Sequence, residues 1–242
     1  MVANPPFAGD VKESRILAKY DMSCALSLER VKSVPNGVTI VPEEPNFPDA
    51  LKNGGETVYQ MGDGTFRTAK LKQASSMSRD ILFVERNLDS LKPGGRMAIV
   101  LPQGRFNNSS DKALREYIAD RCRILAVVGL HGNVFKPHTG TKTSVLFVQK
   151  WDDTLCPRVE DYNIFFATMQ EPSKDNSGDK IYRSTTNAEG ETVALLDSHG
   201  HLIVKHDLFN HDGLTEDGIA EAFIEFAKKE NLSFFADAPL TK

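Results

Sequence analysis

Four consecutive residues near the start of the chain combine the polarity and stiffness needed to hold a planar amino group. They are Asn4, Pro5, Pro6 and Phe7. The asparagine side-chain oxygen accepts a hydrogen bond and its NH2 group donates one. Each proline fixes its own φ and has no N–H, so the turn is stiff and its carbonyl oxygens are bare. With a phenylalanine ring that can stack on a flat substrate, the tetrapeptide predicts a site for a planar nitrogen nucleophile. A surface turn is the alternative.

Composition limits the kind of protein to which such a site can belong. The chain has 242 residues, of which 40% are hydrophobic, enough for a core in one domain or one domain plus an extension. Its net charge of −4 argues against strong autonomous binding to nucleic acid and indicates that any DNA contact is shared with a partner. We expect no membrane span and no signal peptide. Cys24, Cys122 and Cys156 form no zinc spacing and are expected as buried or free thiols in a reducing cytoplasm.

The elements that would position this site follow from the hydrophobic pattern. Residues 16–34 show a loose helical or irregular pattern, and residues 35–70 hold many turn formers that predict a long surface excursion with two short strands. From Met77 onward the pattern becomes regular, and it predicts helices and strands in the order of an open α/β sheet. The predicted ranges are a helix over 77–91, a strand over 96–102, a capped helix from 107, strands over 123–130 and 143–148, a strand over 163–167, a loop over 171–190 and an amphipathic helix over 215–230.

Four segments stand in a recognisable order along the chain. They are Asn4-Pro5-Pro6-Phe7, the turn and strand LKPGGRMAIVLP at residues 91–102, the strand VVGL at 127–130, and GNVFKPHTGTKTSVLF at 132–147. Together they resemble the adenine-N6 DNA methyltransferases, and most closely the modification subunit of type I restriction-modification systems. The resemblance runs from residue 2 to about residue 151, and a weaker likeness continues over residues 163–182.

The resemblance implies a fold and a set of roles. The fold would be the C-terminal part of an α/β, Rossmann-like S-adenosylmethionine-dependent methyltransferase sheet, mixed with an antiparallel edge pair, plus a C-terminal extension. Residues 1–168 would form a partial catalytic domain, and residues 169–242 the extension with its one amphipathic helix. Asn4 and the Pro5 carbonyl would hold the adenine amino group, and Phe7 would stack on the base. Phe135 would be a second aromatic on the base, or else a core aromatic that caps the sheet.

The mechanism implied for this family centres on a weak nucleophile. The adenine N6 lone pair is delocalised into the ring, and hydrogen bonds accepted from both N–H groups would shift the nitrogen toward sp3 and aim its lone pair at the methyl group. Such bonds act by positioning and electrostatic preorganisation, and no strong base is needed before transfer. The base must also leave the duplex, and stacking on the two phenylalanines would offset the lost base stacking.

The family's donor-binding segment, a glycine-rich turn after a first strand and a later acidic residue, precedes the Asn-Pro-Pro-Phe motif. This chain starts at the motif, and its stretch His138–Thr143 lacks the phosphate-loop spacing. We therefore expect no cofactor-binding residues here and a fragment that is inactive alone. The resemblance further implies DNA, a specificity subunit and a restriction subunit as partners, and a cytoplasmic location. Exposed sheet edges could drive self-association.

Two other functions remain open from the residues. One is a non-catalytic assembly or DNA-binding module of the same complex. The other is a fragment of an N-methyltransferase acting on protein glutamine or RNA, because Asn-Pro-Pro-aromatic motifs serve those enzymes too. The segment Gly132–Phe147 favours the DNA enzyme over this last alternative.

Two further groups of side chains are candidates for binding. Arg105, Lys136 and Lys142 fall in loops near the expected ligand edge and could contact phosphate, or they are solvated surface charges. Four histidines cluster in sequence: His199, His201, His206 and His211. A metal site would need converging geometry and a carboxylate such as Asp197 or Asp207, and the spacing fits no known signature, so we expect solvated loop histidines and no metal.

The first prediction concerns the methyl donor. Titration of this chain alone with S-adenosylmethionine in a calorimeter is expected to give no binding heat at micromolar concentrations, because the residues that would hold the donor are expected elsewhere. A micromolar dissociation constant would contradict that expectation.

Overall fold

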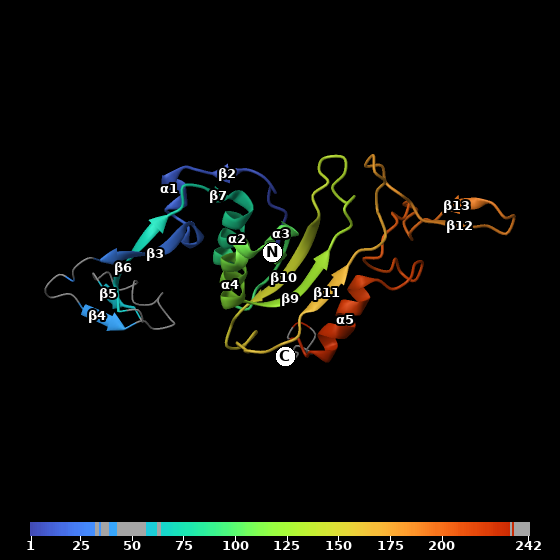
Figure 1. Ribbon diagram of the computed structural model, residues 1–242. Coiled ribbons are helices and arrows are strands. Elements are labelled where there is room, and N and C mark those ends of the chain that lie inside the picture. Colours follow the sequence, from blue (N-terminus) through green and yellow to red (C-terminus); the bar gives the residue numbers. More distant parts are fainter. Residues whose placement is uncertain (32–33, 35–38, 43–56, 62–63, 233, 235–242) are drawn as a thin grey trace. The chain divides into compact units, whose positions relative to one another are not determined.

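The computed structural model describes the chain except for residues 32–33, 35–38, 43–56, 62–63, 233 and 235–242 (Figure 1). The chain divides into two compact units. Unit 1 comprises residues 1–7 and 86–242, and unit 2 comprises residues 8–85. No helix of the described residues is long and apolar enough to cross a membrane.

Unit 1 is built on a mixed sheet of five strands in the order β1-β8-β10-β9-β11. The strands are β1 (Val2–Ala3), β8 (Arg96–Pro102), β9 (Cys122–Gly129), β10 (Thr143–Lys150) and β11 (Phe165–Thr168). β1 runs parallel to β8 and β11 parallel to β9, whereas β10 is antiparallel to both β8 and β9. The predicted α/β class and the antiparallel pair of the last two apolar runs are confirmed. β11 pairs on the outer side of β9, so this antiparallel pair lies inside the sheet and not at its edge as predicted.

Alternation along the strands sorts their side chains onto two faces. In β10, Leu146 and Val148 are buried on one face, while Phe147 lies on the other. The face with Phe147 is covered by the amphipathic helix α5 (Ile219–Lys229), whose Phe223 and Ala227 pack against it with Leu125. Helix α4 (Lys112–Arg121), with buried inner residues, lies on the opposite face (Figure 1). The amphipathic helix predicted over residues 215–230 is therefore present and packs on the body of the protein, although it begins at residue 219.

The end of β10 is tied to the end of helix α2 (Arg79–Ser90), which matches the helix predicted over residues 77–91. The Lys150 ammonium donates hydrogen bonds to the carbonyl oxygens of Leu88 at 2.8 Å and Leu91 at 2.9 Å. Leu88 belongs to the last turn of the helix and Leu91 follows its last residue, at the end where helix carbonyls lack intrahelical partners. The Leu88 carbonyl oxygen also accepts a long hydrogen bond from the Leu91 N–H at 3.3 Å. A cation at a helix C-terminus is also favoured by the helix dipole.

Unit 2 contains a four-stranded sheet in the order β3-β6-β5-β4. Its strands are β3 (Cys24–Val31), β4 (Thr39–Pro42), β5 (Thr57–Gln60) and β6 (Phe66–Gln73). The unit also holds α1 (Ser14–Leu17), the 3-10 turn η1 (Asp21–Ser23) and the short pair β2 (Asp10–Val11) with β7 (Met77–Ser78). The buried Glu85 carboxylate holds the turn η1 by accepting hydrogen bonds from the backbone N–H of Asp21 at 2.6 Å and of Met22 at 2.9 Å.

Two sequence predictions for this unit fared differently. The two strands expected within residues 35–70 are present as β5 and the start of β6, and they are antiparallel. The helical interpretation of residues 16–34 was wrong for β3, which pairs along its whole length with β6, because a distant partner strand overrides a weak local pattern. The turn formers predicted at 35–38, 43–56 and 62–63 lie outside the described residues.

The last third of the chain belongs to unit 1. The loop predicted over residues 171–190 also contains β12 (Ser184–Thr186), which forms a small hairpin with β13 (Thr192–Ala194) that was not predicted. All residues of its two strands are exposed, so no buried face produced a hydrophobic signal in the sequence. The division into residues 1–168 and 169–242 stays a prediction.

The lysine that caps α2 gives a test of the fold. We expect Lys150→Met to lower the free energy of unfolding by about 1–3 kcal/mol, because the variant loses two charge-assisted hydrogen bonds to carbonyl oxygens at the end of α2. Urea titration followed by the fluorescence of Trp151, the single tryptophan, measures the change. Lys92→Met is the matched control, because Lys92 is exposed and should shift the midpoint little. Equal effects of the two variants would refute the capping role.

Candidate functional site

Five strand ends meet at one edge of the unit 1 sheet. Because β1, β8, β9 and β11 run in the same direction and β10 runs opposite to them, four carboxyl ends lie beside the amino end of β10. Ligands of open α/β sheets bind outside the carboxyl ends of the strands. The segments at this edge are Asn4–Phe7 after β1, the short helix α3 (Gly104–Asn107) after β8, and the connection between β9 and β10.

The first of these segments keeps its polar groups available. Asn4 is exposed and Pro5 is buried, so the turn is anchored by a proline ring and presents an amide. Within the described part of the chain, neither the Asn4 side chain nor the Pro5 carbonyl oxygen has a hydrogen-bond partner. Two consecutive residues at the ligand edge of the sheet therefore each carry an unpaired acceptor, and an amino group with two N–H donors needs two acceptors.

The two predicted aromatic residues contact each other, although 128 positions separate them. The ring centroids of Phe7 and Phe135 are 5.3 Å apart, with an interplanar angle of 82°. This edge-to-face geometry is the preferred one for aromatic pairs. A base sandwiched between two rings needs about 7 Å between them, twice a contact distance of about 3.5 Å. As they stand, the rings touch each other, so a base could enter between them only if one ring turned aside.

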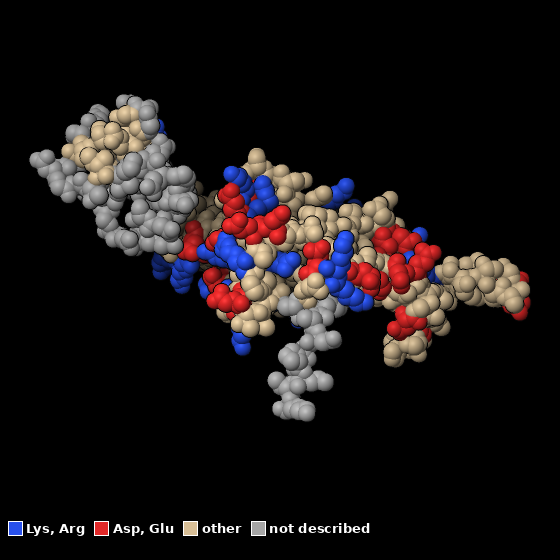
Figure 2. All heavy atoms as spheres, turned by 90° about the horizontal axis from the view of Figure 1, so that it is seen from below, with Lys and Arg blue, Asp and Glu red and all other residues tan. Residues whose placement is uncertain are grey.

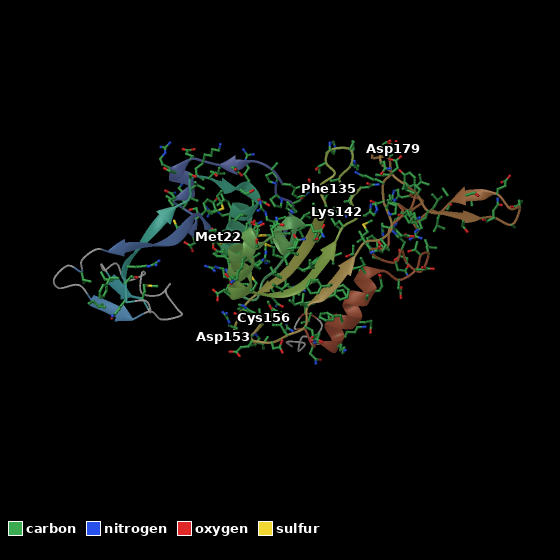
Figure 3. The ribbon with its side chains drawn as sticks, in the orientation of Figure 1. Met22, Phe135, Lys142, Asp153, Cys156 and Asp179 are labelled. Carbon is green, nitrogen blue, oxygen red and sulfur yellow. The ribbon has the colours of Figure 1, made fainter. Side chains whose placement is uncertain are left out.

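The connection that carries Phe135 is held by a segment far along the chain. Asn133 Nδ2 donates hydrogen bonds to the Lys174 carbonyl oxygen at 3.0 Å and to Asn176 Oδ1 at 3.3 Å. The Lys174 ammonium in turn donates to the Lys136 carbonyl oxygen at 2.8 Å. Figure 3 shows Phe135 and Lys142 on this connection at the end of β10. These tethers fix the backbone on both sides of Phe135.

The three predicted phosphate contacts occupy different surroundings. Arg105 pairs with the buried Asp111 at 2.9 Å, and only 20% of its side chain is exposed, so it joins α3 to the start of α4. Lys136 is half-buried, whereas Lys142 is exposed and lines a cavity at the same edge. On the face shown in Figure 2, Lys and Arg side chains are interspersed with Asp and Glu, with no broad basic patch. Lys142 is thus the member of this set that is best placed to meet a ligand.

A cavity of about 680 Å³ lies at this edge, between α3 and β11. Its walls include Phe106, Asn107, Phe166 and Gln170, none of which was predicted from the sequence. The only sequence signal was the Phe165-Phe166 pair, which predicts a strand without showing which ring faces out.

The residues at this edge do not fit S-adenosylmethionine. A ribose is commonly held by a carboxylate at a strand end, and no Asp or Glu lines this cavity. The stretch His138–Thr143 contains one glycine, and its local hydrogen bonds join Thr139 to Thr141. This cavity therefore offers no carboxylate to a donor's ribose.

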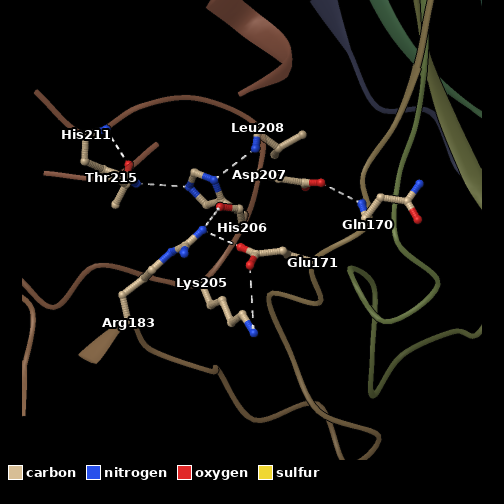
Figure 4. A network of polar contacts seen from close by, with 9 residues as sticks. All are labelled: Gln170, Glu171, Arg183, Lys205, His206, Asp207, Leu208, His211 and Thr215. Atoms are coloured by element: carbon tan, nitrogen blue, oxygen red, sulfur yellow. Dashed lines mark hydrogen bonds and ion pairs between the residues drawn. The ribbon is translucent and has the colours of Figure 1, made fainter. Parts of the chain in front are cut away.

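The predicted histidine cluster separates into two pairs. His199 and His201 are exposed and flank Asp197, whose pKa is lowered mainly by a hydrogen bond from the His201 backbone. His206 and His211 instead approach each other, with 3.1 Å between their Nε2 atoms (Figure 4). Among the described residues, no three His, Cys, Asp or Glu side chains are grouped to hold a metal ion. The expectation of solvated loop histidines was therefore wrong for His206 and His211, because the chain folds back over residues 207–210.

The hydrogen bonds around His206 show which ring nitrogen carries the proton when the ring is neutral. Its Nδ1 accepts a hydrogen bond from the Leu208 N–H at 3.2 Å, so in the neutral ring the proton lies on Nε2, facing His211. Burial lowers the pKa of His206, and the nearby His211 and Arg183 lower it further. Arg183 also forms an ion pair with Glu171 and donates to the His206 carbonyl oxygen at 2.7 Å. The remaining charged neighbours are Lys205, 3.9 Å from Glu171, and Asp207, which accepts from the Gln170 N–H at 2.8 Å.

The three cysteines are free thiols, as expected from their spacing. Cys24 is exposed, while Cys122 and Cys156 are buried. Burial raises the pKa of Cys122 to about 12 and also raises the pKa of Cys156. Neither buried thiol is a reactive nucleophile at neutral pH.

The fold and this edge define an α/β protein in which an exposed asparagine and a stiff proline turn lie beside an aromatic loop. A model of the N-6 DNA Methylase family matches residues 17–194 of the 242-residue chain, and the chain belongs to that family. The matched range contains Phe135 and begins after Asn4–Phe7. The roles of these four residues therefore stay predictions.

Individual relatives of similar sequence are methylase subunits of type I restriction enzymes. The Type I restriction enzyme EcoEI methylase subunit of Escherichia coli is 34% identical over 118 residues, which are 48% of this chain and 22% of that protein. The EcoKI methylase subunit of Escherichia coli strain K12 is 26% identical over 135 residues, 53% of this chain and 25% of that protein. The crystal structure of the EcoKI M protein matches with a TM-score of 0.34 and 22% identity, over 42% of this chain and 22% of that chain. The chain spans about a quarter or less of the length of these curated relatives.

The histidine pair predicts a pH dependence of stability. A histidine whose pKa is lowered by folding binds fewer protons in the folded state, so its stabilising contribution is complete above the ordinary pKa of about 6.5 and is lost as the pH falls through that value. We expect the urea midpoint of the chain to decline between pH 7 and pH 5. His206→Gln should flatten that decline, while the exposed His199→Gln should not. Parallel pH profiles for the chain and His206→Gln would contradict the assignment.

Proposed function

We propose that this chain is part of the catalytic domain of a type I restriction-modification methylase subunit, which methylates the N6 atom of adenine in DNA. The observation that carries the proposal is the meeting of two predicted elements at one strand edge: the unpaired acceptors of Asn4 and Pro5, and the contact of Phe7 with Phe135. Family membership and the similarity to type I methylase subunits support DNA as the substrate over protein or RNA.

The chain's own residues would act on the amino group. Asn4 Oδ1 and the Pro5 carbonyl oxygen accept its two N–H groups, which localises the lone pair on nitrogen and fixes its direction. The Pro5 carbonyl oxygen and the backbone of Asn4 are held before the substrate arrives, because Pro5 is buried and a proline restricts both its own backbone and that of the residue before it. Preorganised acceptors avoid the cost of orienting polar groups during the reaction. No residue of the turn has to act as a strong base.

The aromatic pair would receive the extruded base. Before a base enters, the rings of Phe7 and Phe135 contact each other edge to face, and this contact shields part of each apolar ring from water. Entry of adenine replaces this contact with base stacking and so offsets part of the cost of removing the base from the duplex. We expect one ring to turn about its side-chain bonds, because Pro5 is buried near Phe7 and hydrogen bonds hold the backbone on both sides of Phe135.

The methyl donor of this family is S-adenosylmethionine, which supplies an electrophilic methyl group. We propose that it binds at residues other than those at the described strand ends, where no fitting site is formed. The specificity and restriction subunits of a type I complex are the proposed partners, and the net charge of −4 is consistent with DNA contacts that are shared among subunits. A cytoplasmic location agrees with the free thiols.

The acceptor role of Asn4 can be tested in a longer protein that joins this chain to a donor-binding segment of the family. We expect Asn4→Ala to reduce transfer of labelled methyl groups to plasmid DNA by at least about 100-fold, comparable to the loss of one preorganised hydrogen bond in other enzymes. The loss should fall on kcat more than on KM, because the bond matters most in the transition state.

Asn4→Asp is the matched control, since its carboxylate keeps an oxygen that accepts hydrogen bonds. It should retain more activity than Asn4→Ala. Full activity of Asn4→Ala would exclude the proposed role. Methylation of a protein substrate, with none of plasmid DNA, would favour the protein-glutamine alternative.

A further inference from the structure

The cavity between α3 and β11 is separate from the Phe7–Phe135 contact, although both lie at the carboxyl edge of the same sheet. Its volume of about 680 Å³ falls within the range of about 300–1,000 Å³ that is usual for small-ligand sites. None of the residues that line it belongs to the segment Asn4–Phe7. The cavity therefore has room for a group of its own.

One wall of the cavity is an aromatic ring that the fold leaves uncovered. Phe166 of β11 is 69% exposed, whereas its neighbour Phe165 packs against Phe223 and Phe226 of α5 on the other face of the sheet. Isolated exposed apolar residues are normal on protein surfaces. Phe166 differs because its ring borders a cavity that also holds the ring of Phe106. Such a surface can stack on a flat apolar ligand.

The polar side chains that line the cavity are neutral or basic. Gln103, Asn107 and Gln170 contribute side-chain amides, which can both donate to and accept from the edge of a base. Gln170 Nε2 already donates one hydrogen bond, to the Thr168 carbonyl oxygen at 3.1 Å. Lys142 and His131 are the lining residues with basic side chains, and no carboxylate lines the cavity, although the chain has 33 acidic and 29 basic residues in all. The cavity thus accepts negative charge in a chain whose overall charge is negative.

The cavity and the proposed adenine site share one loop. His131 and Gly132 lie at its start and Lys142 at its end, and all three line the cavity, while Phe135 in its middle contacts Phe7. A strand of DNA that delivered its adenine to Phe7 would leave the neighbouring nucleotides unstacked near this loop. Base stacking on an aromatic side chain compensates for that loss without regard to sequence.

We propose that this cavity binds one unpaired nucleotide of DNA, with its base against Phe166, the base edge at Asn107 and Gln170, and a phosphate at Lys142. The inference rests on the proposed function, because it places this nucleotide beside an extruded adenine. Direct binding to single-stranded DNA is its observable consequence and does not require methyl transfer.

Two glycines in the loop between β9 and β10 allow a side chain to be added inside the cavity or outside it. Gly132 lines it, does not have a positive φ, and has no atom within 4 Å of the place where a Cβ would stand. Gly140 lies in the same loop outside the cavity, and an added Cβ there would meet only the end of the Lys136 side chain, at 3.8 Å. Gly132→Leu should therefore block the cavity, and Gly140→Leu is its matched control.

The test measures binding of the full chain to a fluorescein-labelled single-stranded DNA 12-mer by anisotropy at low salt. We expect Gly132→Leu and Phe166→Ala each to raise Kd about 10-fold, within the range that follows from losing one base–aromatic stack. Gly140→Leu should leave Kd unchanged. Phe83→Ala, which removes another exposed phenylalanine, should do the same. In a second readout, an oligonucleotide carrying 5-iodouracil should cross-link by irradiation to the peptide that contains Phe166, and Gly132→Leu should abolish that product.

Three results would overturn the inference: no measurable binding of the 12-mer, unchanged affinity in both cavity variants, or cross-links only at other peptides. Tighter binding of an RNA of the same sequence would assign the cavity to RNA and would also overturn it. Each of these leaves the proposed function standing, because that function is judged by methylation of duplex DNA and by the Asn4 variants. Conversely, a nucleotide in the cavity combined with an active Asn4→Ala enzyme would separate the two sites.

Discussion

The pairing of β10 with both β8 and β9 is the constraint on which the unit 1 site depends. Ser144 stands opposite Leu101 of β8 and Gly129 of β9, so one reversed strand aligns the ends of its two neighbours. A shift of one residue in this register would exchange the two faces of the strand and bury Phe147 in place of Leu146. It would also move the loop that carries Phe135 relative to β1. The position of the aromatic contact is therefore a consequence of backbone pairing in the middle of the sheet.

The elements of unit 1 could be predicted because their signals are local. Helix α2, the strands β8, β9 and β10 and helix α5 each bury one face or a continuous run, and burial leaves a period in the sequence. Elements without a local signal were missed. β3 depends on its pairing with a strand that lies far along the chain, and the exposed hairpin β12–β13 has no buried face.

The candidate site was partly predictable for a related reason. The order of motifs placed Phe7 and Phe135 in one site, and the structure brings their rings into contact. Phe166 could not be identified in the same way, because its exposure depends on α5 covering the opposite face of β11. The approach of His206 to His211 likewise depends on the path of the chain between them, which includes the packing of Phe209 against both rings. Geometry of this kind arises from tertiary structure and leaves no spacing rule in the sequence.

The tethers on the loop between β9 and β10 have a practical consequence. Asn133 and Lys136 are held by Lys174 and Asn176, and the nearby Gln170 and Glu171 are joined to Asp207 and Arg183. Hydrogen bonds from the part of the chain beyond residue 168 thus restrict the loop between β9 and β10, which carries Phe135. An expression product that stopped at that residue would keep every strand of the sheet and yet release Phe135 from its support, so crystallographers who trim this protein should cut elsewhere.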